Sequence, residues 1–148
     1  MITQARPTAQ CAAALMTHVP AVIRSLRAEL RQHGQPHFSL SQLRVLYFLN
    51  RQPHSSLSEV ADYLDVTRPT MSAMVDRLVQ RGLVQRIDDP HERRRVALSL
   101  TPIGSDALEQ VYGATLFSVE QRLNRLDEEQ LSQVMVGLSI LGELFSDS

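Results

Sequence analysis

Three consecutive arginines, Arg93, Arg94 and Arg95, stand in a polar loop that also contains three acidic residues. Such a concentration of positive charge repels itself, and an anionic partner such as duplex DNA relieves the repulsion. An arginine at a loop tip can also probe a minor groove. The alternative is a solvated loop neutralised by its own acids. We expect some of the arginines to pair with those acids and to leave another available for a partner.

A second polar cluster opens a predicted helix that begins just after Thr67. One arc of about 140° on this helix is apolar and must face a core. The opposite half carries small and hydrogen-bonding side chains with two arginines. Free backbone N–H groups and the helix dipole favour phosphate at its first turn, where side chains can also reach base edges. The alternative is a capped surface helix. The candidate contacts are Thr67, Arg68, Pro69, Thr70, Ser72 and Arg77.

These two clusters belong to one ordered segment. Ser56 and Glu59 have the spacing of a capping box, in which each side chain binds the other's backbone N–H, so a helix is expected from about Leu57. A break of about three residues separates it from the second helix, which Gly82 ends. Two strands, 83–87 and 96–100, then flank the arginine loop. Two short helices followed by an arginine-tipped ribbon can engage both grooves of DNA.

The rest of the chain is predicted to be helical. Ser39 and Gln42 suggest a second capping box, and Pro20 is expected to kink the first helix. The first and last helices are too apolar for the surface of a monomer, so we expect them to pack against their copies in a two-fold dimer burying more than ~2,000 Å². The expected helices are 8–31, 41–50, 102–125 and a final one capped by Asp127.

The ordered motifs resemble those of the MarR family of winged helix-turn-helix regulators. They are Asp65–Ser72, Val75–Leu78, Arg81–Val84, Asp89–Arg94 and Leu98–Gly104. The resemblance implies a homodimeric transcription factor, usually a repressor, bound to a palindromic operator in double-stranded DNA. It places the second helix in the major groove and Arg93 or Arg94 in the minor groove, with Ser56 and Arg95 as further candidate contacts. Glu92, where the family usually has aspartate, and Ala73, at a position often polar or basic, depart from the family pattern.

The resemblance also fixes the expected architecture. The fold class is mainly α with a small β-hairpin wing, an α+β arrangement in a single domain over 1–148. A helical dimerisation lobe comprises 1–35 and 102–148, and a winged helix-turn-helix DNA-binding lobe comprises 37–101. From 37 to 101 there are nine arginines and seven acids (+2), against six and nine elsewhere (−3), which sum to the formal net charge of −1. This asymmetry supports nucleic-acid binding only weakly.

A small, often phenolic or aromatic effector is a further implication of the resemblance. A ligand wedged between the lobes would change the separation of the two recognition helices, which must sit ~34–36 Å apart to meet successive major grooves. For each candidate, an ordinary core or solvated role is the alternative. The candidates are Met16, Arg24, His37, Phe38, Tyr47 and Phe48.

Other classes of function are less well supported. The single cysteine, Cys11, allows no intramolecular disulfide and suggests a reducing cytoplasm, but its position resembles that of the peroxide-sensing branch of the family. The alternative for Cys11 is a small buried hydrophobe. No secretory signal, membrane-length apolar run, metal-ligand spacing, cofactor motif or catalytic motif is present in the sequence, so neither an enzyme nor a metal site is expected. A winged-helix module that binds protein instead of DNA remains the competing reading.

Overall fold

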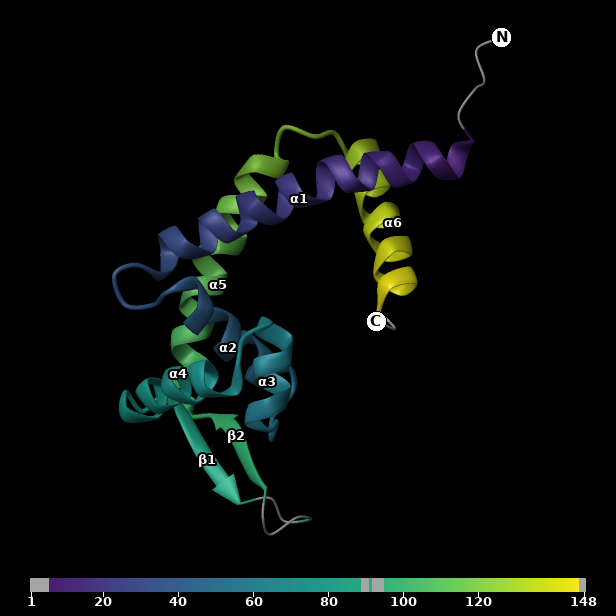
Figure 1. Ribbon diagram of the computed structural model, residues 1–148. Helices are drawn as coiled ribbons and strands as arrows, with labels where there is room; N and C mark the ends of the chain where they lie inside the picture. The colour runs from purple at the N-terminus through teal and green to yellow at the C-terminus, as the bar shows by residue number, and fades with distance from the viewer. Residues whose placement is uncertain (1–5, 89–90, 92–94, 147–148) are drawn as a thin grey trace.

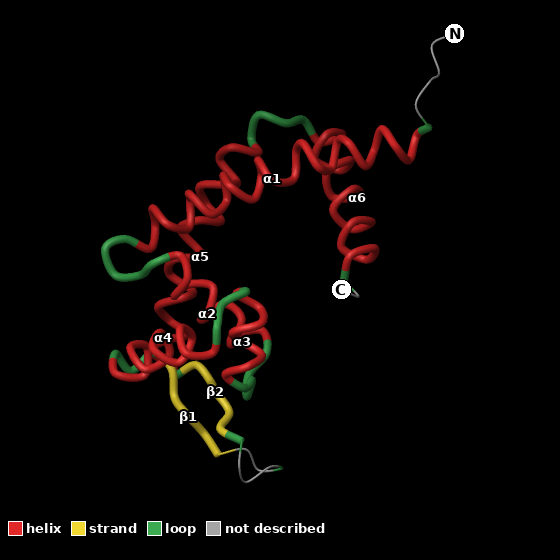
Figure 2. Tube along the Cα trace, in the orientation of Figure 1, coloured by secondary structure: helices red, strands yellow, loops and turns green. Residues whose placement is uncertain are grey.

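The computed structural model describes residues 6–88, 91 and 95–146 (Figures 1 and 2). Over these residues the chain forms six helices and one antiparallel hairpin, so the predicted mainly helical fold with a small β wing is confirmed. The elements are α1 (Pro7–Gly34), α2 (Leu40–Arg51), α3 (Leu57–Leu64), α4 (Arg68–Gln80), β1 (Val84–Asp88), β2 (Val96–Leu100), α5 (Pro102–Leu123) and α6 (Glu128–Phe145).

The predicted helix boundaries differ from the observed ones by three residues at most. α1 extends to Gly34, beyond the predicted end at 31, and continues as one helix across Pro20. α5 ends at Leu123, two residues earlier than predicted. The capping box at the start of α2 is confirmed, because Ser39 and Gln42 each bind the other's backbone N–H.

The capping box predicted for α3 is only half formed. The Ser56 hydroxyl accepts a hydrogen bond from the backbone N–H of Glu59 at 3.2 Å, as expected. The Glu59 carboxylate does not return the bond to Ser56. It pairs instead with the guanidinium of Arg95, immediately before β2. The reciprocal prediction was therefore wrong, because a distant cation binds the acid in place of the local N–H.

A three-residue turn joins α3 to α4, as predicted. Asp65 ends α3 in the left-handed conformation, with φ of 55°. Thr67 caps α4, and its hydroxyl accepts from the backbone N–H of Thr70 at 3.3 Å. After α4, Gly82 adopts φ of 73°, a value that favours glycine and confirms the predicted stop.

The wing is a two-stranded ribbon anchored at its root. Val84 pairs with Leu100 at one end of the ladder and Asp88 with Val96 at the other. The backbone N–H of Leu98 also donates to the carbonyl of Ser55 at 2.7 Å, which ties β2 to the segment before α3. An isolated hairpin is marginally stable, so its packing against the helices keeps it folded.

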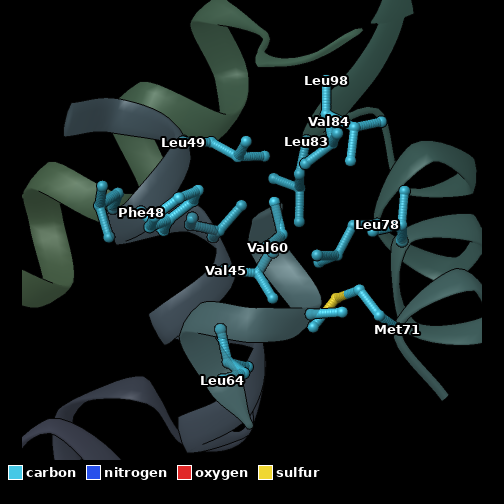
Figure 3. Packing of buried hydrophobic residues seen from close by; sticks show 14 residues of the cluster. Val45, Phe48, Leu49, Val60, Leu64, Met71, Leu78, Leu83, Val84 and Leu98 are labelled. Carbon is cyan, nitrogen blue, oxygen red and sulfur yellow. The ribbon is translucent and has the colours of Figure 1, made fainter. Parts of the chain in front are cut away.

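The core lies between α2, α3, α4 and the root of the wing (Figure 3). Met71, Val75 and Leu78 are fully buried on one face of α4, which confirms the predicted apolar arc of that helix. The opposite face is left for solvent or a partner. The other members of this cluster are Val45, Leu46, Phe48, Leu49, Val60, Ala61, Leu64, Leu83, Val84, Leu98 and Leu108.

A close backbone contact joins the start of α5 to the start of the wing. The Thr101 hydroxyl accepts from the backbone N–H of Gly104 at 3.0 Å and donates to the carbonyl of Gly82 at 2.5 Å. A Cβ on Gly104 would lie 2.0 Å from the carbonyl oxygen of Leu83. Only glycine fits there, so this contact fixes where α5 leaves the part of the molecule that contains the core and the wing.

The other end of the molecule is formed by α1, the distal part of α5, and α6 (Figure 1). Glu29 of α1 is bound by Ser118 at 2.7 Å and Arg122 at 2.9 Å, both from α5. α6 is different, since none of its residues is buried. Among the described residues no helix is both long and apolar enough to cross a membrane.

Candidate DNA-binding surface

The N-terminal turn of α4 is the first part of the candidate surface. Arg68, Pro69 and Thr70 are all exposed there, and Ser72 is half-buried. Thr67 is more constrained than expected, because its hydroxyl accepts from the Thr70 N–H and also donates to the Thr70 hydroxyl at 2.9 Å. Ser56 is likewise used as the cap of α3. These two residues shape helix ends, while Arg68 and Thr70 present side chains outward.

The outer flank of α4 forms a groove with the N-terminus of α2. Thr70 and Arg77, two helical turns apart, lie along this groove, whose volume is about 490 Å³. Gln42 of α2 and its N-cap residue Ser39 line the other side, and Pro69, Ala73 and Met74 of α4 complete the lining. The groove thus combines hydroxyl, amide and guanidinium groups, which suit phosphate and base edges.

Ser39 and Gln42 are members of the candidate surface that the sequence analysis did not identify. Their capping-box spacing was recognised, but spacing along one helix does not reveal which other helix lies beside it. The groove lined by the start of α2 and by α4 supplies that information. Both side chains remain half-buried or exposed while they cap α2.

The wing forms the second part of the surface. α4 and the two strands lie together at the end of the molecule opposite α1 and α6 (Figure 1). Arg95 lies immediately before β2, at the loop end of the ribbon, bound to Glu59. Arg93 and Arg94, the arginines predicted to enter the minor groove, fall outside the described residues.

Two acids accompany the arginines of the wing. Asp76, on the exposed side of α4, pairs with Arg86 of β1. Glu59 of α3 pairs with Arg95 at the start of β2. Each edge of the ribbon is therefore tied to a different helix of the helix-turn-helix. The sequence analysis assigned no role to Arg86.

Sequence comparison agrees with this geometry. Residues 38–95, from the end of the α1–α2 connection to the residue before β2, match the profile of the MarR family. The HTH-type transcriptional repressor MdtR of Bacillus subtilis is 32% identical over 93 residues, which cover 63% of this chain and 60% of MdtR. The similarity of this chain to the MarR family is carried by residues 38–95. The matched part spans less than two thirds of MdtR itself.

Solved MarR-family structures have the same fold. A MarR family protein from Bacillus stearothermophilus superposes with a TM-score of 0.81 at 20% identity, over 93% of this chain and 96% of that protein. A mutant of S. aureus MepR, solved bound to an oligodeoxyribonucleotide, superposes with a TM-score of 0.62 at 22% identity, over 85% and 94% of the two chains. The likeness extends beyond the matched segment to the helices at both ends of the chain.

The effector residues expected of a MarR-family protein do not converge within one chain. Met16 lines a cavity between α1 and α6, while Arg24 lines a separate groove along α1. Phe38 is covered by the guanidinium of Arg81, 4.8 Å from its ring centroid. Tyr47 and Phe48 share a cavity of about 340 Å³, and His37 is exposed in the connection before α2.

The Tyr47 cavity adjoins a cluster that contains all three tyrosines of the chain. Tyr47 stacks on Tyr112 with ring centroids 5.0 Å apart, and Tyr63 packs on Phe48 at 4.7 Å. The Tyr47 hydroxyl accepts a hydrogen bond from Arg51 at 3.0 Å. Burial, with a smaller contribution from Tyr47, raises the pKa of Tyr112 to about 12, so its hydroxyl stays protonated at neutral pH.

A metal site and a redox site at Cys11 are two other kinds of site to consider among the described residues. Among the residues that it describes, no three histidine, cysteine, aspartate or glutamate side chains lie close enough to hold a metal ion. Cys11 is exposed on α1, so the reading of a buried hydrophobe is wrong for the single chain. The peroxide-sensing reading of Cys11 stays a prediction, because none of these contacts tests it.

Proposed function

We propose that this MarR-family protein is a homodimeric, sequence-specific regulator of transcription that binds a palindromic operator, acts as a repressor in the cytoplasm and is released by a small-molecule effector. The observation that carries the proposal is that α4, on which Arg68, Thr70 and Arg77 are exposed, lies with the wing at one end of the molecule (Figure 1). A helix and a ribbon at that end can engage a major groove and the adjacent minor groove together.

The proposed dimer rests on the uncovered apolar surface at the other end. α1 and α6 border a cavity of about 670 Å³ lined almost entirely by aliphatic and aromatic side chains. Large apolar residues of both helices are exposed around it, among them Met16, Leu138 and Phe145, and such apolar faces commonly mark interaction sites. A second copy placed by a two-fold axis would cover it with the same surface. The lining residues are Leu15, Met16, Val19, Pro20, Val22, Ile23, Leu138, Leu141, Gly142 and Phe145.

The MepR complex and the MdtR name support DNA binding and repression, respectively, as properties to test in this chain. A protein-binding winged helix is disfavoured by the polar and basic groups along α4. An apolar docking face would be expected of such a module, whereas the large apolar faces lie on α1 and α6.

Arg77 provides the direct test of the site assignment. We expect Arg77→Ala to weaken operator binding by about 1–3 kcal/mol and to flatten its salt dependence, because one base or phosphate contact is lost. Arg94→Ala is expected to do the same if the wing arginine enters the minor groove. Fluorescence anisotropy with an operator recovered from a random-oligonucleotide selection, measured over a range of salt concentrations, gives both quantities.

Arg125→Ala is the matched control for this test. Arg125 is an exposed arginine beyond the end of α5, far along the chain from α4, so its loss removes the same charge outside the proposed interface. Binding by this variant should match wild type at physiological salt. Equal binding by wild type, Arg77→Ala and Arg94→Ala at matched salt would refute the assigned contacts and leave the fold intact.

The effector part of the proposal rests on the cavity beside Tyr47. Tyr47 and Phe48 lie on α2, which connects the DNA-binding end of the molecule to α1 and α5. An aromatic ligand there would push against the helix that links the two ends and so change the spacing of paired α4 helices. Operator release by phenolic compounds, and its loss in Tyr47→Ala, would support this route. Release that is identical in the variant would contradict it.

A further inference from the structure

Glu59 departs from the role that its position predicts. It is the third residue of α3, where a glutamate normally completes a capping box with the N-cap serine. Here its carboxylate pairs with the guanidinium of Arg95, 36 positions later in the chain. The α3 cap consequently keeps one of its two reciprocal bonds, the one from the Glu59 N–H to Ser56.

Arg95 marks the point where the chain re-enters the sheet. It immediately precedes Val96, the first residue of β2, which pairs with Asp88 at the far end of the ladder. A contact at Arg95, three residues before Leu98, holds the start of β2. The Ser55–Leu98 hydrogen bond holds the middle of the strand, and the root is held by buried Val84. From Val84 to Asp88 the strand rises ~13 Å, so a tilt of ~10° about the root would move its end by ~2 Å.

Stability does not account for this contact. The side chains of Arg95 and Glu59 are 36% and 45% exposed, and ion pairs this open to solvent contribute little to folding. The pair also places a carboxylate near the surface proposed to meet phosphates, where an unpaired acid would repel DNA. Pairing with Arg95 neutralises that charge and fixes the direction of the strand.

The second edge of the ribbon is held in the same manner. Arg86 of β1 pairs with Asp76 of α4, so the two strands are tied to the two helices of the helix-turn-helix. A displacement of ~2 Å exceeds the few tenths of an ångström within which hydrogen bonds to base edges are maintained. The angle of the ribbon therefore determines whether its end and α4 can contact DNA together.

We infer that Glu59 is a positioning residue for operator discrimination, which sets the angle of the wing through Arg95 without itself contacting DNA. This inference rests on the proposed DNA-binding function. Glu59 lies on α3, outside both α4 and the wing, and would nevertheless control how well the protein distinguishes its operator from other sequences.

Glu59→Gln tests the inference without harming the fold. Glutamine keeps the size of the side chain and can complete the capping box with Ser56, so the thermal unfolding midpoint should stay close to that of wild type. We expect the ratio of affinities for the selected operator and for a scrambled duplex to fall at least about fivefold. Affinity for the scrambled duplex should rise about threefold at low salt, because the loss of one acid strengthens phosphate attraction.

Two further variants separate positioning from a simple change of charge. Asp62→Asn removes an exposed acid from the same helix, and Asp62 makes no ion pair with any residue that the structure describes. Its affinity ratio should remain that of wild type. In Glu59→Gln/Arg95→Gln the loss of an acid is balanced by the loss of an arginine, so the rise in affinity for scrambled DNA should disappear. The lowered affinity ratio should persist, because both substitutions break the same contact.

The possible results are distinct. The inference would be overturned if the affinity ratio of Glu59→Gln equalled that of wild type or of Asp62→Asn. It would also be overturned if the thermal unfolding midpoint fell strongly and affinity fell equally for the operator and the scrambled duplex. The proposed function is judged separately by wild type. If wild type shows no preference for any selected duplex, the proposed function fails and the inference fails with it.

Discussion

Leu138→Glu is expected to convert the protein into a monomer and to lower its affinity for a palindromic duplex by about 10²–10⁴-fold. Leu138 is 60% exposed in the single chain and lines the apolar cavity between α1 and α6. An unpaired carboxylate buried at the proposed two-fold interface would cost several kcal/mol. Without the dimer, each recognition helix binds its half-site alone and the gain from linked binding is lost. Analytical ultracentrifugation and anisotropy measure the two effects.

Ser132→Glu is the control for this substitution. Ser132 is also exposed on α6 but shares the polar strip of that helix with Glu129 and Glu143. The added charge there should leave both the mass and the affinity unchanged. A Leu138→Glu variant that remains dimeric at micromolar concentration would show that this face is not the interface. Loss of dimer with retained affinity would contradict the need for two linked helices.

Gly104→Ala is expected to reduce the free energy of unfolding by about 3 kcal/mol. The new Cβ would lie 2.0 Å from the Leu83 carbonyl oxygen, a backbone atom that cannot rotate away as a side chain does. Either α5 or the segment entering β1 must shift. The usual gain of ~1 kcal/mol from replacing a helical glycine by alanine is too small to offset that strain. Urea denaturation followed by circular dichroism gives the difference.

Gly113 provides the comparison within the same helix. A Cβ at Gly113 meets no atom within 4 Å, so Gly113→Ala should be neutral or stabilising by up to ~1 kcal/mol. Opposite signs for the two substitutions would identify the Leu83 contact as the cause. Equal effects at the two positions would show that α5 can move away from Leu83 at little cost.

The sequence was most informative where the signal is local. Thr101 followed by Pro102 correctly predicted the start of α5, and Gly82 correctly predicted the end of α4, because caps and left-handed glycines depend on a few neighbouring residues. The strand expected over 96–100 likewise matches β2. These rules involve contacts within about four positions, so no tertiary information was needed.

Glu59 shows where local rules fail. The capping-box spacing was correct, but the preferred partner of the carboxylate was a cation 36 residues away. A charged distant group competes well with a local N–H, and sequence spacing does not reveal which distant groups are adjacent. The same limit explains why Ser39 and Gln42 were assigned to a helix cap and not to the groove beside α4.

The effector candidates show a different limit. Arg24, Met16 and Tyr47 were grouped because the family resemblance implies a ligand between the lobes, yet they line separate cavities of the single chain. α6 has no buried residue, which fits the proposed dimer, in which a second copy would cover it. A site shared between two copies cannot be assembled from the contacts of either one.

Under the proposed mode of binding, two copies of the chain hold their α4 helices one DNA turn apart. Duplexes that carry two selected half-sites at varied separation provide the test of this spacing. Affinity should be greatest at a centre-to-centre spacing of about 10 base pairs and should fall by at least about 100-fold when ~5 base pairs are inserted, because the second half-site then faces away from the protein. Affinity independent of the spacing, or equal to that for a scrambled duplex at every salt concentration, would contradict the proposed mode of binding.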